Sequence, residues 1–282
     1  MSVLAREQPE LRIIRPASRW AGPSLRELWR FRELLYFLTV RDLKVRYKQT
    51  FLGVIWAILQ PVMYMIVFTL FFSRVAHLYT PGQAYAPLTL TGSVIWVFFA
   101  NSVTLGSASL VGNANLITKV YFPRVLAPVG PVLASVVDLL LSSVVALGIM
   151  AAYGYYPALR IVVAIPFVLL ALGTAIGVSA WLASLNVKYR DVRYVVPFLL
   201  QLWMFASSVF YSVTALGLHQ PWNTIYWINP MAGAVEGFRW SLLGGPHPTY
   251  SHVAISTLGG LVVLVMGLLY FRRKEREFAD IV

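Results

Sequence analysis

Residues 41–61 read RDLKVRYKQTFLGVIWAILQP, and this stretch changes from a basic segment to an uncharged apolar segment near its midpoint. After its last basic residue, Lys48, the chain carries no charged side chain until Arg74. An uncharged apolar run of about 20 residues is long enough to cross the ~30 Å hydrocarbon core of a bilayer as a helix. The stretch therefore predicts a cationic segment joined directly to a membrane-spanning helix.

The bulk composition places most of the chain in lipid. Of its 282 residues, 59% are hydrophobic and 12% are charged, and the mean hydropathy is +0.70, whereas a soluble domain is about a quarter charged. Cysteine is absent, and histidine, aspartate and glutamate form no cluster with the spacing of metal ligands. No nucleophile–base pair is recognisable. The sequence therefore predicts an all-α integral membrane protein with no metal site and no catalytic residue.

Six apolar stretches are long enough to be transmembrane helices. An even number of crossings puts both termini on one side, and the excess of Lys and Arg identifies that side as cytoplasmic. The four proposed inner segments hold eleven, two, three and four basic residues, 20 of the chain's 23, so the net charge of +12 does not indicate nucleic-acid binding. The predicted spans are residues 53–73, 88–111, 128–152, 160–185, 195–212 and 252–271.

The segment before the first span divides into a tail and a helix. Residues 1–30 are predicted to be a cytoplasmic tail, since they are rich in arginine and proline and lack the apolar core of a secretory signal peptide. The next residues have the apolar period of a helix lying along the membrane surface, and Gly53 permits a turn into the bilayer. Its apolar face is predicted to hold Tyr36, Phe37, Val40, Leu43 and Tyr47, and its cationic face Arg41, Arg46 and Lys48, with Lys44 at the flank.

Residues 213–251 lie outside in this topology, yet they are too apolar for an aqueous loop. They break at Gln220-Pro221 and at Asn229-Pro230, each a predicted helix boundary. Irregular backbone at membrane depth survives where protein packs it or where it lines a wet cavity. We therefore expect two re-entrant half-helices forming an outer gate, with a possible pair between Glu236 and Arg239 on one helix face. The gate residues are predicted to be Trp222, Trp227, Glu236 and Arg239.

Asp138 lies about mid-way along the third predicted span, where an unpaired carboxylate costs several kcal/mol. No cation within the spans is an obvious partner, whereas Ser135, Ser142 and Ser143 could supply hydrogen bonds. A proton relay would need more than one such group. We therefore expect a structural or dimer-interface role for Asp138.

Four motifs together resemble one family. RDLKVRYKQTFLGVIWAILQP, then NLITKVYFPR, then LNVKYRDVRYVVPFLLQ, then INPM followed by GFRW are similar to the membrane subunit of polysaccharide ABC exporters, the ABC-2 type permeases that move O-antigen, capsule or teichoic acid. The resemblance covers residues 33–275 in order, within a transmembrane domain predicted over residues 31–275. The arginine-rich tail at 1–30 departs from it, and residues 276–282 are predicted to be a second cytoplasmic tail.

The resemblance implies a homodimer joined to two copies of an ABC ATPase, exporting lipid-linked polysaccharide, O-antigen above all, across a bacterial inner (plasma) membrane. ATP and magnesium would bind the ATPase, because this chain has no G-x-x-x-x-G-K-[ST] phosphate loop. The inner loop 112–127 would then be the coupling element, with a short helix capped by an asparagine and cations facing acidic groups. The predicted coupling residues are Asn113, Asn115, Lys119, Tyr121, Phe122 and Arg124, with Lys188, Arg190 and Asp191 of the next inner loop, which could equally stay solvated.

Aromatic residues make up 14% of the chain. Sugar rings can stack on aromatic side chains, although Trp and Tyr also gather at membrane interfaces. Gln60-Pro61 is predicted to kink the first span and to turn a polar group inward. The candidates for lining a substrate channel are Gln60, Tyr64, Trp96, Phe99, Trp203 and Phe210.

Other function classes fit the sequence less well. A secondary transporter typically has internal repeats and several buried ionisable groups, and a membrane glycosyltransferase would need an acidic cluster in its cytoplasmic loops. Within the resembled family, export of capsule or teichoic acid and export of drugs or lipids remain alternatives. Besides its protein partners, the chain is expected to contact membrane lipids and no nucleic acid.

Overall fold

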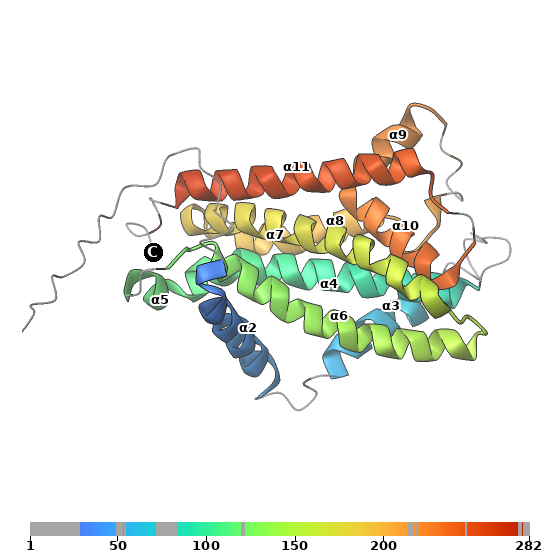
Figure 1. Cartoon of the computed structure of the whole chain (residues 1–282), viewed down its shortest axis with the longest axis horizontal. Helices are drawn as coiled ribbons and strands as arrows, with labels where there is room; N and C mark the ends of the chain where they lie inside the picture. Colours follow the sequence, from blue (N-terminus) through green and yellow to red (C-terminus); the bar gives the residue numbers. More distant parts are fainter. Residues whose placement is uncertain are drawn as a thin grey trace, which may run out of the picture.

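The computed structural model describes most of the chain as helices that run along one long axis (Figure 1). The described residues contain no strand. Four helices lie side by side and are long and apolar enough to cross a membrane, the third of them together with the 3-10 turn Ala158–Val163. This confirms an all-helical integral membrane protein. The four are α4 (Tyr85–Gly112), α6 (Leu126–Ala152), α7 (Ala164–Lys188) and α11 (Tyr250–Lys274). The described residues are 29–48, 53, 55–71, 84–119, 122–213, 217, 219–245, 247–275 and 278.

Two further apolar helices coincide with the first and fifth predicted spans but are shorter. Helix α3 (Ile55–Phe71) has 17 residues and α8 (Val192–Phe205) has 14. At 1.5 Å per residue they are about 26 Å and 21 Å long, less than the ~30 Å hydrocarbon core. The predicted fifth span, 195–212, is wrong at its upper end, because the helix stops at Phe205. Beyond it, the carbonyls of three residues accept hydrogen bonds from the Arg239 guanidinium.

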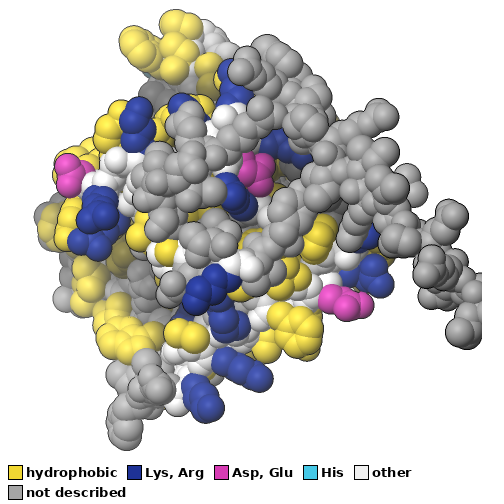
Figure 2. Space-filling view, turned by 90° about the vertical axis from the view of Figure 1, so that its left-hand side faces the viewer, with side chains coloured by type: hydrophobic (Ala, Val, Ile, Leu, Met, Phe, Trp, Pro, Cys, Tyr) yellow, Lys and Arg dark blue, Asp and Glu magenta, His cyan; other side chains and the backbone are white. Residues whose placement is uncertain are grey.

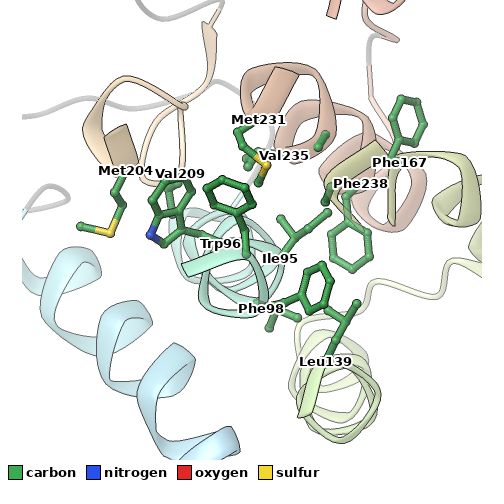
Figure 3. Packing of buried hydrophobic residues seen from close by; sticks show 14 of the residues in the cluster. Ile95, Trp96, Phe98, Leu139, Phe167, Met204, Val209, Met231, Val235 and Phe238 are labelled. Carbon is green, nitrogen blue, oxygen red and sulfur yellow. The ribbon is translucent and has the colours of Figure 1, made fainter. Parts of the chain in front are cut away.

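Helix α4 occupies the centre of the bundle and contacts α3, α6, α7, α8 and α10 (Pro230–Leu243). Three of its buried hydroxyls are satisfied within the helix: Thr89, Thr91 and Ser93 each bond a carbonyl three or four residues earlier. Around it lies the main hydrophobic cluster (Figure 3), to which α4, α6, α7, α8 and α10 contribute. Its labelled members include Ile95, Trp96, Phe98, Leu139, Phe167, Met204, Val235 and Phe238.

Helix α10 is short but deeply buried, since 12 of its 14 residues are buried. The predicted boundary at Asn229-Pro230 is confirmed: Pro230 is the first residue of α10, and the Asn229 side chain caps it by accepting from Met231 N at 3.0 Å. Helix α9 (Trp222–Trp227) begins directly after Pro221, at the other predicted boundary. Both helices lie toward the right-hand end of the bundle in Figure 1.

A second hydrophobic cluster lies toward the opposite end of the bundle, where α2 (Arg32–Tyr47) and α5 (Ala114–Lys119) also lie (Figure 1). Apolar side chains of α2, the α5–α6 connection, α7 and α11 meet in it. Figure 2 looks onto this end and shows Lys and Arg side chains spread over it. We call this surface the basic end and define it by its exposed cations Lys119, Lys188, Arg190, Arg193 and Arg273.

A tight crossing of α7 and α11 at Gly177 generates a test of the packing. An ideal Cβ on Gly177 would lie 2.6 Å from both Leu264 Cα and Val263 O, which belong to the α11 backbone. We expect Gly177→Ala to lower the free energy of unfolding by about 1–3 kcal/mol, because α11 must shift. The measurement is thermal unfolding of the purified chain in detergent. Gly148→Ala is the matched control, since a Cβ there would meet nothing within 4 Å. Equal melting temperatures for the two variants would contradict the tight crossing.

Candidate functional site

Helix α2 packs on α6 through its Leu38 side. Leu38 is buried against α6, and three residues of the preceding turns join the same cluster. Tyr36 and Phe37, predicted to lie on the apolar face of a helix along the membrane surface, are 65% and 67% exposed. The helix packs its Leu38 side against protein and turns these aromatic rings away from it, so their contact with lipid stays a prediction. The three neighbouring cluster residues are Phe31, Leu34 and Leu35.

The predicted cationic face is wrong at Arg46, which turns inward. The Arg46 guanidinium forms an ion pair with the Asp138 carboxylate of α6, and the Tyr47 hydroxyl donates a hydrogen bond to the other carboxylate oxygen. The Arg46 side chain is 24% exposed and that of Asp138 is 7% exposed. The predicted spans contain no obvious cation partner for Asp138, and the structure shows that its partner, Arg46, belongs to α2 instead. Burial, and then the bond to Asp138, raise the pKa of Tyr47 to about 12, so its phenol keeps its proton.

Two serines near Asp138, Ser135 and Ser142, donate hydrogen bonds to backbone carbonyls. Ser135 Oγ donates to Pro131 O, and Ser142 Oγ lies 2.7 Å from Ala57 O and 2.8 Å from Asp138 O. Ala57 lies four residues before Pro61 in α3, and proline has no N–H to donate to that carbonyl. Ser142 therefore supplies a partner to a carbonyl that α3 itself leaves unsatisfied. The expectation that the serines bond the Asp138 side chain is not met at either of these two positions.

The first inner loop contains the predicted short helix, α5, directly after Asn113. The Asn113 side chain caps the preceding helix instead, donating to Ser109 O at 2.8 Å, and Asn115 belongs to α5. Phe122 is buried in the second cluster, so it anchors the loop to the bundle. Arg124 bonds Glu275 at the end of α11 through its backbone N–H and its guanidinium. Of the predicted coupling residues in this loop, Lys119 is exposed at the surface, and Tyr121 lies outside the described residues.

The second inner loop is a solvent-facing turn between α7 and α8. Lys188, Arg190 and Asp191 are all exposed there. Lys188 lies over the ring of Tyr189, at 5.3 Å from its centroid. The first and second inner loops, with Lys119, Lys188 and Arg190, lie at the same end of the bundle, where α5 and the end of α7 lie (Figure 1). On α2, Lys44 and Lys48 are exposed, whereas Arg41 is half-buried and bonds Asp42 at 2.7 Å.

The aromatic channel candidates form part of an aromatic cluster inside the helical bundle. Trp96 and Phe99 lie 5.3 Å apart between centroids, and Phe99 lies 5.1 Å from Trp203. Tyr64 lies 6.0 Å from Phe210, and the latter stacks on Phe68 at 3.4 Å. Trp96, Phe99 and Phe210 are buried, so in this conformation they contact neighbouring side chains. Their assignment to a channel stays a prediction, as does that of Gln60, which is half-buried on α3.

The residues predicted for the outer gate differ in their surroundings. Trp222 is exposed, whereas Trp227 is buried and its ring stacks on His252 at 4.8 Å. The proposed Glu236–Arg239 pair is confirmed, with Arg239 Nη1 2.9 Å from Glu236 Oε1. Both side chains are largely buried, and Glu236 Oε1 also accepts from Val213 N at 2.9 Å. The helical spacing predicted the pair and gave no sign of its burial.

The Arg239 guanidinium holds three parts of the chain together. Its Nη2 donates to Ser208 O at 2.7 Å and Val209 O at 3.1 Å, its Nη1 to Tyr211 O at 3.1 Å, and its Nε to Leu88 O at 3.3 Å. One side chain of α10 therefore fixes the turns after α8 against the first residues of α4. The sequence held one signal for this role. Arg239 and Glu236 are the two charged residues of an otherwise uncharged, largely apolar helix.

Comparison with known proteins supports the same class. A family model described as the ABC-2 type transporter matches residues 33–243. The chain is 29% identical to the O-antigen export system permease protein RfbA of Myxococcus xanthus over 91% of this chain and 98% of that protein. It is 30% identical to the protein of the same name from Klebsiella pneumoniae, over 88% of this chain and 95% of that one. The polysialic acid transport protein KpsM of Escherichia coli is 21% identical, over 84% and 92%.

The Arg239 contacts generate a stability prediction. Arg239→Lys keeps the charge but loses the planar fork of donors, so several buried carbonyls lose their partner. We expect the free energy of unfolding to fall by about 3 kcal/mol, the scale for breaking a buried pair. Limited proteolysis within residues 206–213 and thermal unfolding in detergent measure the effect. Arg193→Lys, an exposed position, is the control. A melting temperature for Arg239→Lys that matches the control would contradict the role of the guanidinium.

Proposed function

The chain belongs to the ABC-2 type transporter family, and on that premise we propose that it is the membrane-spanning permease subunit of an ATP-driven exporter of lipid-linked polysaccharide, with O-antigen as the first candidate. The observation that carries the proposal is the pair of relatives named O-antigen export permeases, which match about nine-tenths of this chain and nearly all of their own length. Near-complete coverage in both directions supports the same kind of subunit. The polysaccharide would cross the bacterial inner membrane from its cytoplasmic side.

The proposed topology has six crossings, with both termini in the cytoplasm. Four helices are long enough on their own, and α3 and α8 would cross together with the segments that flank them. The distribution of charge supports the orientation, since the exposed cations of the inner loops gather at the basic end (Figure 2). Helices α9 and α10 would then form the re-entrant outer element, because they lie toward the opposite end (Figure 1).

The proposed partners are two copies of an ABC ATPase and a second copy of this chain. ATP and magnesium would bind the ATPase, because this sequence has no phosphate-binding loop of the G-x-x-x-x-G-K-[ST] type. The basic end is the proposed docking surface, since the cations Lys119, Lys188 and Arg190 are exposed there and would meet acidic groups of the partner. Asp191, exposed in the same loop, would meet a cation of the partner. Arg124 and Phe122 would act indirectly, because their contacts hold the loop to the bundle.

A second candidate within the same class is export of a capsular polysaccharide. The relative that favours it is the polysialic acid transport protein, although its identity to this chain is lower, at 21%. In either case the aromatic cluster around Phe99 and Trp203 would contribute sugar-stacking surfaces only after the helices around it separate, because Phe99 is buried in this conformation.

Deleting the gene in its own host tests the function. We expect O-antigen to disappear from the cell surface and its lipid-linked precursor to accumulate in the inner membrane, because export stops while synthesis continues. Immunolabelling of whole cells and analysis of extracted lipid-linked glycan measure the two effects. Restoring the wild-type gene is the control. Normal surface O-antigen with loss of a capsule would favour the second candidate, and no change in either glycan would contradict polysaccharide export.

Charge reversal at the basic end tests the docking surface. We expect Lys119→Glu combined with Arg190→Glu to weaken binding of the ATPase by at least about tenfold, because like charges replace complementary ones. Co-purification and ATP hydrolysis of the assembled complex are the measurements. Arg160→Glu is the matched control, since this exposed arginine lies in the turn before α7, at the other end of that helix from Lys188. Undiminished assembly and hydrolysis in the double variant would remove the docking assignment.

A further inference from the structure

We propose that Arg46, Tyr47 and Asp138 form a latch that makes α2 and the first half of α6 move as one body during transport. This inference rests on the proposed function, because it assigns a path by which a displacement at the basic end reaches the membrane helices. The three side chains are positioning residues and need not touch the polysaccharide. We call them the elbow latch.

The contact between α2 and α6 runs in register over about two helical turns. Leu38 and Arg46 are eight residues apart on α2, and their partners Gly130 and Asp138 are eight apart on α6. Asp42, between them, approaches an ideal Cβ on Gly130 at 3.6 Å. Residues spaced by four lie on one helix face, so positions 38, 42 and 46 form a single stripe along α6. An apolar contact at one end of the stripe and an ion pair at the other fix both the spacing and the direction of the two helices.

The ion pair adds what apolar packing lacks, namely a fixed position along the helix axis. Apolar side chains lose little free energy when one helix slides past another, because hydrophobic contact is non-directional. If α2 slid by one turn, the Arg46 guanidinium and the Tyr47 phenol would find no second carboxylate on α6. The largely buried Asp138 carboxylate would then be left alone, which is costly. The elbow latch therefore sets the register of α2 on α6.

Helix α6 connects the latch to the basic end. It begins at Leu126, a few residues after α5, and Phe122, Val125 and Leu126 share one buried cluster with Leu38 of α2. A displacement of the α5 loop would thus move α2 and α6 together through this shared cluster. Without the latch, only apolar contacts would hold α2 on α6, and α2 would be free to slide along it.

The same region of α6 also holds the start of α3. Ser142, one turn beyond Asp138, bonds the Ala57 carbonyl that Pro61 leaves without an intrahelical donor. The two limbs of the elbow, α2 and α3, therefore contact α6 at positions four residues apart. A movement of this part of α6 carries the end of the surface helix and the beginning of the first apolar helix together.

A disulfide can replace the latch in a chain that has no native cysteine. An ideal Cβ on Gly130 lies 3.4 Å from Leu38 Cβ, close to the ~3.8 Å mean Cβ separation of disulfides. We expect Asp138→Asn to reduce export by at least about tenfold, because Arg46 loses its carboxylate, while the ATPase still binds. Adding Leu38→Cys and Gly130→Cys and oxidising the pair should restore at least half of the wild-type export rate, and reduction should remove it again.

Two results of that experiment would overturn the latch. If oxidised Leu38→Cys/Gly130→Cys stops export in a chain that keeps Asp138, α2 has to leave α6 during the cycle. If Asp138→Asn exports at the wild-type rate, the pair is dispensable. Glu33→Gln, which removes an exposed carboxylate from the same helix, is the control and should export normally.

A distance measurement separates the latch from the proposed function. Spin labels at Lys44→Cys on α2 and Val144→Cys on α6, both exposed positions, report on the elbow in the purified complex in lipid vesicles, diluted with unlabelled chain. We expect one narrow distance distribution that broadens in Asp138→Asn and narrows again in the oxidised cysteine background. A broad distribution in the chain that keeps Asp138 would contradict the latch. Narrow distances together with no export of any polysaccharide would count against the proposed function and leave the latch standing.

Discussion

Hydrocarbon offers no hydrogen-bond partner, so polar groups between the helices of this chain have to satisfy one another. Many hydroxyls bond a carbonyl of their own helix, and others bond backbone carbonyls of neighbouring elements. Asn186 of α7 donates to Ser107 O of α4 at 3.0 Å, and Ser256 of α11 donates to Trp227 O of α9 at 2.7 Å. Arg239 extends this to four carbonyls with one guanidinium. Because such bonds are directional, they determine which helices stay fixed relative to one another.

Features that depend on neighbouring residues in the chain were predictable from the sequence. The apolar lengths predicted six helices at the positions where helices are found, since helix formation in lipid follows from local hydrophobicity. The start of α10 followed from Asn229-Pro230, in which the amide caps the helix and the proline occupies its first turn. The Glu236–Arg239 pair followed from helical spacing. Each of these rests on chemistry within a few residues.

Features that depend on a distant element were missed. Asp138 lies 92 residues from Arg46, and nothing in the local pattern of either helix indicates that one faces the other. The early end of α8 has the same kind of cause, because the arginine that binds the next carbonyls belongs to α10. The contact of α2 with α6 was missed as well, because nothing in the local pattern of α2 distinguishes Leu38 as the residue that packs there. Which distant residues contact each other is decided by the packing of the helices, and the pattern of neighbouring residues in the sequence does not show it.

The two ends of the bundle are held by different kinds of interaction, and this has a mechanical consequence. Near the Arg239 end, a buried guanidinium ties α10, α4 and the turns after α8 through four hydrogen bonds, and releasing it would leave several buried carbonyls unpaired. At the basic end, α7 contributes only small or β-branched apolar residues, Ala180, Ala183 and Val187, to the cluster that it shares with α2 and α6. Apolar surfaces of this kind can slide without losing a directional bond. A displacement of α2 and α6 together against α7 therefore breaks fewer directional hydrogen bonds among the described residues than a displacement of α10 against α4, whereas the Asn186 bond to Ser107 O keeps α7 on α4.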